Sequence, residues 1–237
     1  MIIWVESRTG EPISVNFNPS ITIGEFKHIR LLQCTLYNSW YNITPANNVL
    51  RFKVLKGGYK TKTLKPGNYN IETLNEAIDL PNNITFHKSK PTGRVKLKLS
   101  NDWEVIFHYA RNFAGLLGFN EEKISSSQEG PKPANFLSVS QYVIHCDAID
   151  RAENYVAGGE GEWIKGKPAD YLQILPLRET REVCEKVVYD VKNPTNMPLK
   201  RDGAGVLSSM KIWITDQNGK PIDFHRYPYS LCIELTS

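Results

Sequence analysis

The stretch MKIWITDQNG, residues 210–219, gives the clearest indication of the fold. Its apolar side chains recur at every second position, the pattern of a β-strand with one buried face. The strand pattern ends in the pair Asn218-Gly219, because both residues tolerate the positive φ of a tight turn. A second strand follows at residues 230–235. The side chains predicted to face the core are Met210, Ile212 and Ile214 in the first strand and Leu231, Ile233 and Leu235 in the second.

The same alternation recurs along the chain. In RVKLKL, residues 94–99, apolar side chains alternate with basic ones, which predicts one face in a core and one in solvent. Residues 28–37 are expected to place Leu32, Cys34 and Leu36 on one face. Plentiful Tyr, Phe and Trp beside Val, Ile and Thr favour strands as well. Further strands are predicted at residues 49–54, 137–148, 171–177 and 184–189.

Two short helices are predicted between the strands. Asn70 is a suitable N-cap for the first helix. Its apolar stripe consists of Ile71, Leu74 and Ile78. A second apolar helix is expected to stop at Gly118, because glycine readily takes the left-handed conformation that follows a helix. Neither helix is long enough to be stable alone, so each is expected to pack on a sheet.

These elements predict an all-β protein. We expect residues 1–237 to form a single jelly-roll sandwich of two four-stranded antiparallel sheets, with the two helices in connections. Long connections favour jelly-roll or Greek-key wiring over a meander, and a barrel is the main alternative. No composition shift marks a domain boundary. The segments expected outside the core are an N-terminal arm or edge segment at 1–25, a polar loop at 125–133 and a long surface loop at 151–168.

Composition excludes several classes of protein. The chain has a net charge of +4 and no long Lys/Arg run, so we expect no specific nucleic-acid partner. No stretch approaches the roughly 20 apolar residues of a membrane span. The N-terminus lacks the pattern of a signal peptide, so neither membrane insertion nor secretion by that route is expected. Four scattered cysteines, Cys34, Cys146, Cys184 and Cys232, predict buried free thiols made in a reducing compartment.

One segment has the outline of a phosphate-binding loop. GEWIKGKP, from Gly161 to Pro168, reads G-x-x-x-x-G-K. However, Pro168 stands where the motif needs a hydroxyl for Mg²⁺, and it disfavours a helix at Lys167. The preceding residues are too rich in glycine for a core strand, and the following ones read as a strand. We therefore interpret the segment as part of the surface loop, whose candidate interaction residues are Trp163, Lys165 and Lys167.

No other motif predicts catalysis. In a strand Cys146 points away from His145 and Asp147, so these three cannot converge on a substrate. Paired carboxylates at Glu121-Glu122 and at Glu160/Glu162 lie in predicted loops beside lysines, where solvated charge explains them. No histidine has a partner at a metal-binding spacing. We therefore predict no enzymatic activity, no catalytic or metal-binding residues and no cofactor.

Several motifs occur in a fixed order along the chain. They are NSWYNIT (38–44), LKPGNY (64–69), FAGLLGF (113–119), VIHCDAI (143–149), LQILP (172–176) and IWITDQNGKPIDF (212–224). In their order and spacing the chain resembles the minor capsid (penton) proteins of Polinton/Maverick elements and adintoviruses over residues 28–235. It departs from their pattern in the longer loop at 151–168, at Gln173 and Ile174, and at residues 233–235.

The resemblance implies a structural protein of the virion. It implies a single jelly roll that assembles into homopentamers at the icosahedral vertices of a virus or virus-like mobile element. The expected partners are further copies of the chain, the major capsid protein and a vertex fibre or spike, and the expected site of synthesis is the host cytoplasm or nucleus. Exposed aromatic residues such as Trp163 or Trp40 leave an alternative open, a cytosolic jelly-roll module that binds carbohydrate or protein.

Overall fold

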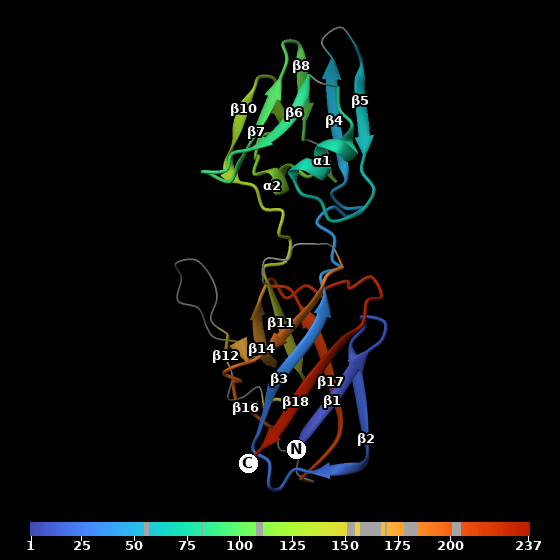
Figure 1. The fold of residues 1–237 in the computed structure, drawn as a ribbon, viewed down its shortest axis with the longest axis vertical. Coiled ribbons are helices and arrows are strands. Elements are labelled where there is room, and N and C mark those ends of the chain that lie inside the picture. The colour runs from blue at the N-terminus through green and yellow to red at the C-terminus, as the bar shows by residue number, and fades with distance from the viewer. Residues whose placement is uncertain are drawn as a thin grey trace. The chain divides into compact units, whose positions relative to one another are not determined.

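The computed structural model describes residues 1–54, 57–81, 83–107, 111–150, 155–156, 167–168, 170–177, 184–200 and 205–237. The chain forms two compact units: unit 1 consists of Met1–Trp40 and Val139–Ser237, and unit 2 of Tyr41–Ser138. Unit 2 is therefore one continuous segment that interrupts unit 1 (Figure 1). Each unit has its own hydrophobic core.

Unit 1 consists of antiparallel strands. Its two main sheets have the orders β1-β18-β3-β15, with β16 paired to β3, and β14-β11-β17-β2, while β12 pairs with β13. The strands are β1 (Ile2–Ser7), β2 (Ile13–Thr22), β3 (His28–Tyr37), β11 (Gln141–Cys146), β12 (Tyr155–Val156), β13 (Lys167–Pro168), β14 (Tyr171–Pro176), β15 (Lys186–Asp190), β16 (Met197–Pro198), β17 (Val206–Thr215) and β18 (Tyr229–Thr236).

The core of unit 1 contains side chains from both main sheets. The predicted inward set of β17 is buried there together with the predicted inward set of β18. The first and last strands are neighbours, and in Figure 1 the two termini lie side by side. The Met1 amine donates a hydrogen bond to the Leu235 carbonyl at 2.8 Å, which adds one more link at this edge.

Unit 2 has two smaller sheets with the orders β10-β7-β6 and β5-β4-β8-β9. Apolar residues of both sheets and both helices form its core. Its elements are β4 (Val49–Val54), β5 (Tyr59–Thr63), α1 (Ile71–Ile78), β6 (Ile84–Lys88), β7 (Arg94–Leu99), β8 (Trp103–Ile106), α2 (Ala114–Leu117), β9 (Lys123–Ile124) and β10 (Gln128–Pro133).

Both predicted helices are confirmed together with their ends. Asn70 caps α1 by accepting a hydrogen bond from the Thr73 N–H at 2.8 Å, and the Thr73 hydroxyl accepts one from the Asn70 N–H at 3.0 Å. This reciprocal pair satisfies two backbone donors at the start of the helix. At the end of α2, Gly118 has a φ of 82°, and its N–H donates to the carbonyls of Ala114 and Gly115.

The predicted turn after β17 is also present. The carboxylate of Asp216 accepts hydrogen bonds from the N–H groups of Asn218 at 2.8 Å and Lys220 at 2.9 Å. Gly219 supplies the positive φ, at 77°. The backbone then pairs back on itself through Thr215 and Pro221, so the turn reverses the chain.

The structure is mostly β, as predicted, but one two-sheet jelly roll over the whole chain is not confirmed. The described residues form more than two sheets around two separate cores. The local signals did not reveal this division, because alternation and turn residues look alike in both units. In unit 1 the two main sheets are separate and do not close into a single barrel.

Residues 1–25, expected as an N-terminal arm or edge segment, contain β1 and β2, each at the edge of a main sheet. Two other local expectations differ from the structure. The expected polar loop at 125–133 contains β10. The sequence did not predict this strand because Pro131 and Pro133 have low strand propensity. Strand β3 buries Leu31 instead of Leu32, because its register with β18 shifts by one residue in this region and the inward positions change phase.

Candidate functional site

The predicted interaction loop falls mainly outside the described residues. Trp163 and Lys165 lie outside them, as does most of the segment that resembles a phosphate-binding loop. Lys167 is the first residue of β13, which pairs antiparallel with β12. The interaction role of these three residues stays a prediction. The other aromatic candidate, Trp40, is not a surface group: it is 5% exposed and packs edge-on against Tyr142 with ring centroids 5.7 Å apart.

The neighbours His145, Cys146 and Asp147 diverge, as the strand pattern predicts. Cys146 is buried in the core of unit 1, and burial raises the pKa of its thiol to about 12. Asp147 instead accepts a hydrogen bond from the Lys211 N–H at 2.7 Å. The thiol therefore has neither the exposure nor the thiolate character of a nucleophile.

His145 belongs to a cluster that the sequence did not reveal. Its Nδ1 lies 2.9 Å from the Asp170 carboxylate, and its Nε2 lies 2.9 Å from the Thr215 hydroxyl. The imidazole also stacks on Trp213, with ring centroids 5.0 Å apart and planes 4° apart. These partners are up to 70 residues away in the chain, so no spacing rule could have found them.

The order hydroxyl, imidazole, carboxylate is that of a Ser-His-Asp triad, but the surroundings do not suit catalysis. Thr215 is only 4% exposed, and its hydroxyl donates to the Asp216 carbonyl at 3.2 Å. A nucleophile needs room for the group that it attacks and donors for the developing oxyanion. We therefore assign this cluster a structural role, in which it links β11, β17 and the residue just before β14.

The clearest candidate for ligand contact is the outer face of the sheet β10-β7-β6 in unit 2. Val95 and Leu97 of β7 are buried, so the residues between them point outward. Lys96 pairs with His87 and Glu129, and Lys98 with Thr85, so these side chains share one face. We call this set the basic face; it consists of Thr85, His87, Arg94, Lys96, Lys98 and Glu129.

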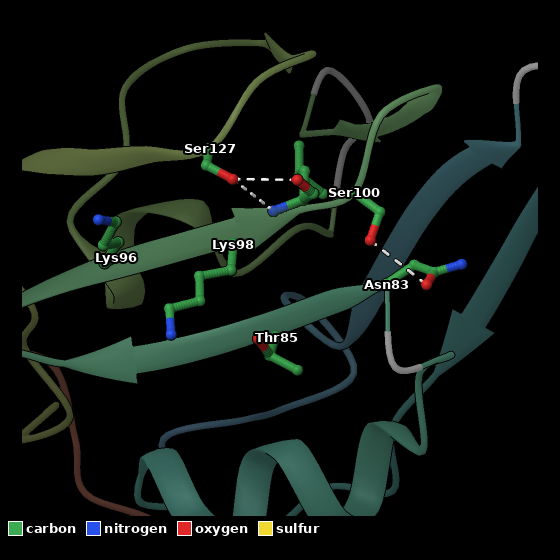
Figure 2. Close-up of a pocket in the computed structure, with 7 residues that line it drawn as sticks. Asn83, Thr85, Lys96, Lys98, Ser100 and Ser127 are labelled. Atoms are coloured by element: carbon green, nitrogen blue, oxygen red, sulfur yellow. Dashed lines mark hydrogen bonds between the residues drawn. The ribbon is translucent and has the colours of Figure 1, made fainter.

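Two adjoining depressions run along the basic face and have Lys96 and Ser127 in common. One has a volume of about 420 Å³ and the other about 550 Å³. Figure 2 shows Lys98 extending from β7 toward the strand that carries Thr85. We refer to the two depressions together as the basic groove. All residues of the basic face except Arg94 line it, and its other lining residues are Asn83, Lys88, Ser89, Leu99, Ser100, Ser127 and Gln128.

The wall of the basic groove is fixed by hydrogen bonds. The Ser127 hydroxyl accepts from the Leu99 N–H at 2.8 Å and donates to the Leu99 carbonyl at 3.0 Å (Figure 2). A side chain thus takes the place of one ladder pair between β7 and β10. The Ser100 hydroxyl donates to the Asn83 side-chain oxygen at 3.3 Å. Both contacts set polar groups in place before any ligand arrives.

A second surface feature lies on the edge strand β1. Met1, Ile2 and Trp4 are 51%, 58% and 64% exposed. We call these three residues the apolar edge. Trp4 pairs with Cys232 of β18, so the apolar edge continues a sheet whose other face is in the core. Large apolar groups clustered on a sheet edge are typical of a surface that another chain covers.

The described residues contain no group of three or more His, Cys, Asp or Glu side chains placed to hold a metal ion. No helix in the described part of the chain is long and apolar enough to span a membrane.

The fold as a whole is that of a β protein with a sandwich-like unit and an inserted second unit. It is similar to the crystal structure of the mavirus penton protein, with a TM-score of 0.51 and 10% sequence identity over 98% of each chain. A chain in the cryo-electron-microscopy structure of the Sputnik virophage gives a TM-score of 0.45 at 10% identity, over 98% of this chain and 96% of that chain. No family model and no curated protein matches the sequence. The likeness to the mavirus penton protein therefore concerns the fold, and it extends across both units.

Proposed function

We propose that this chain is a structural capsid protein of penton type with no enzymatic activity. The observation that carries the proposal is the fold shared with the mavirus penton protein over 98% of both chains. A match to one unit alone would be weak support, since sandwiches serve many functions. Here the interrupting unit is matched as well, and the sequence motifs independently resemble penton proteins of Polinton/Maverick elements and adintoviruses.

The strand order of unit 1 supports a jelly roll. The sheets β1-β18-β3-β15 and β2-β17-β11-β14 place the first strand beside the last and the second beside the next to last. This order arises when a long antiparallel hairpin folds over on itself into two facing sheets. In this proposal unit 1 is the assembling module, and unit 2 is an insertion between β3 and β11.

The proposed assembly is a homopentamer at the vertices of an icosahedral shell. A five-fold ring needs two different surfaces of the subunit to fit each other. The apolar edge is the candidate for one of them, with a second copy of the chain as its occupant. Trp4 is the residue to test, because large aromatic residues contribute most to such interfaces. The further proposed partners are the major capsid protein and a vertex fibre or spike, without specific nucleic-acid binding or membrane insertion.

Light scattering coupled to size-exclusion chromatography tests the assembly. We expect a concentration-dependent species of five subunits, seen as rings by negative-stain electron microscopy. Trp4→Ser should raise the concentration needed for half-assembly at least about tenfold, the effect of losing an interface hot spot. Tyr59→Ser is the matched control, because Tyr59 is an aromatic residue of similar exposure, at 51%, on the edge strand β5. A chain that stays monomeric at all concentrations and is not incorporated on co-expression with its major capsid protein would contradict the proposal.

A further inference from the structure

The basic groove and the face around it carry more positively charged than negatively charged side chains. Lys88, Arg94, Lys96 and Lys98 are all exposed there, against a single carboxylate, Glu129. The formal net charge of the whole chain is only +4. The surface of unit 2 thus carries a local excess of positive charge that is not evident from the net charge of the chain. Such an excess attracts anions over distances of several ångströms.

These cations are not neutralised within the protein. Among the described residues, Arg94, Lys96 and Lys98 form no ion pair, whereas Lys123 pairs with Glu104 at 2.9 Å. The carboxylate of Glu129 accepts a hydrogen bond from the Thr92 hydroxyl at 3.2 Å. The three β7 cations are therefore available to an external ligand.

The spacing of the cations favours a linear ligand. Arg94, Lys96 and Lys98 occupy alternate positions of one strand, so their Cα atoms are about 7 Å apart in a row about 14 Å long. A single phosphate or carboxylate would contact one or two of them. A chain with anions at regular intervals contacts all three and gains from each contact.

The other groups in the groove distinguish between two kinds of polyanion. Single-stranded nucleic acids bind where successive bases can stack on a series of aromatic side chains, whereas the lining of the groove has no Phe, Tyr or Trp and only one ring, the imidazole of His87. Instead it presents the hydroxyls of Thr85 and Ser100 and the amide of Asn83. Within the described residues the amide nitrogen of Asn83 makes no hydrogen bond, and it can donate to a sugar hydroxyl.

We propose that the basic groove binds a linear acidic polysaccharide, with Lys96 and Lys98 contacting its sulfate or carboxylate groups and Asn83 its hydroxyls. Charge provides most of the affinity, so binding weakens as salt rises. The groove would exist in a monomer, so this inference does not depend on the assembly proposed above. On a capsid surface it would be a point of attachment to glycans.

The test is binding of the full chain to immobilised heparin at physiological salt, with desulfated heparin and duplex DNA as parallel probes. We expect the wild-type chain to prefer heparin to both. The double substitution K96E/K98E should raise the Kd for heparin at least about tenfold and reduce the slope of log Kd against log salt by about two. The milder K96Q/K98Q should give a smaller loss in the same direction, with circular dichroism confirming the fold of each variant.

The matched control is K60E/K65E, which changes the net charge equally at two exposed lysines elsewhere in unit 2. It should change the Kd less than about twofold. Equal losses in both double variants, no binding to heparin, or tighter binding to duplex DNA than to heparin would each overturn the inference. A pentamer that does not bind heparin contradicts this inference alone. A chain that binds heparin but stays monomeric and is not incorporated on co-expression with its major capsid protein contradicts only the capsid proposal.

Discussion

The imidazole of His145 lies flat on the indole of Trp213, with ring centroids 5.0 Å apart and an angle of 4° between the planes. The two residues are paired across β11 and β17. Both nitrogens of the imidazole are also within 2.9 Å of polar partners. This is a tightly defined cross-strand contact, and its strength can be measured.

A double-mutant cycle on this pair should give a coupling free energy of about 1 kcal/mol, the usual range for stacked rings. The cycle combines His145→Ala, Trp213→Ala and the double variant, with the free energy of unfolding obtained from urea titration. A second cycle that combines His145→Ala with Ile212→Ala serves as the comparison, because Ile212 lies in β17 next to Trp213 but faces the core. A coupling indistinguishable from zero would show that the stack contributes no stability.

Asn42 should be one of the residues most sensitive to substitution in unit 2. Its side chain donates to the Tyr69 carbonyl at 2.7 Å and the Phe136 carbonyl at 3.0 Å, and accepts from the Tyr69 N–H at 2.9 Å. It thus ties the first residues of unit 2 to the last. Because these backbone groups would lose their partner, Asn42→Ala should cost about 3 kcal/mol. Hydrogen exchange of unit 2 peptides measures the loss, and Asn101→Ala, at an exposed turn, should change stability by less than about 0.5 kcal/mol.

Two glycines with similar backbone conformations should respond differently to alanine. Gly118 has a φ of 82°, and a Cβ there would lie 2.1 Å from the Lys132 carbonyl oxygen. Gly219 has a φ of 77° but open space around it. Gly118→Ala should therefore destabilise unit 2 by more than about 2 kcal/mol, while Gly219→Ala should cost unit 1 about 1 kcal/mol for the strained φ alone. Hydrogen exchange reports both, and similar losses at the two sites would contradict the steric explanation.

The cysteines should differ in reactivity. Burial raises the pKa of the Cys146 thiol to about 12 from the ordinary 9.0, and it also raises the pKa of the Cys34 thiol. At about pH 8 the thiolate fraction of Cys146 falls roughly a thousandfold below that of an ordinary thiol. Alkylation followed by mass spectrometry should label the partly exposed Cys184 first. Equal labelling of Cys184 and Cys146 in the folded protein would contradict this, and labelling in denaturant provides the reference.

The same two thiols predict a loss of stability in alkali. In the unfolded chain they ionise near their ordinary pKa of 9.0, whereas in the folded chain burial keeps them neutral to higher pH. Their contribution is therefore fully present below about pH 9 and is lost as the pH rises above it. Urea titrations across this range should show a falling free energy of unfolding, and Cys146→Ala should reduce the slope of that fall.

The sequence predicts local structure correctly where that structure depends only on residues close together in the chain. The alternation in β7 gave its bounds, and the cap at Asn70 and the stop at Gly118 gave the helices. These signals are local, because side chains two or four residues apart share a face whatever the rest of the chain does. Strand β10 was not predicted because its prolines have low strand propensity, which the tertiary context overrides.

The amino-acid pattern alone predicts a strand-rich chain, the side chains that face inward on most strands, and the positions of several turns and helix ends. Three features emerge only in the folded chain: the pairing of the strands, the separate core of residues 41–138, and the positions of His145 beside Asp170 and of Lys96 and Ser127 along one groove. Alternation specifies that a face must be buried but not what buries it, and pairing between distant strands is selected by the packing of the whole core.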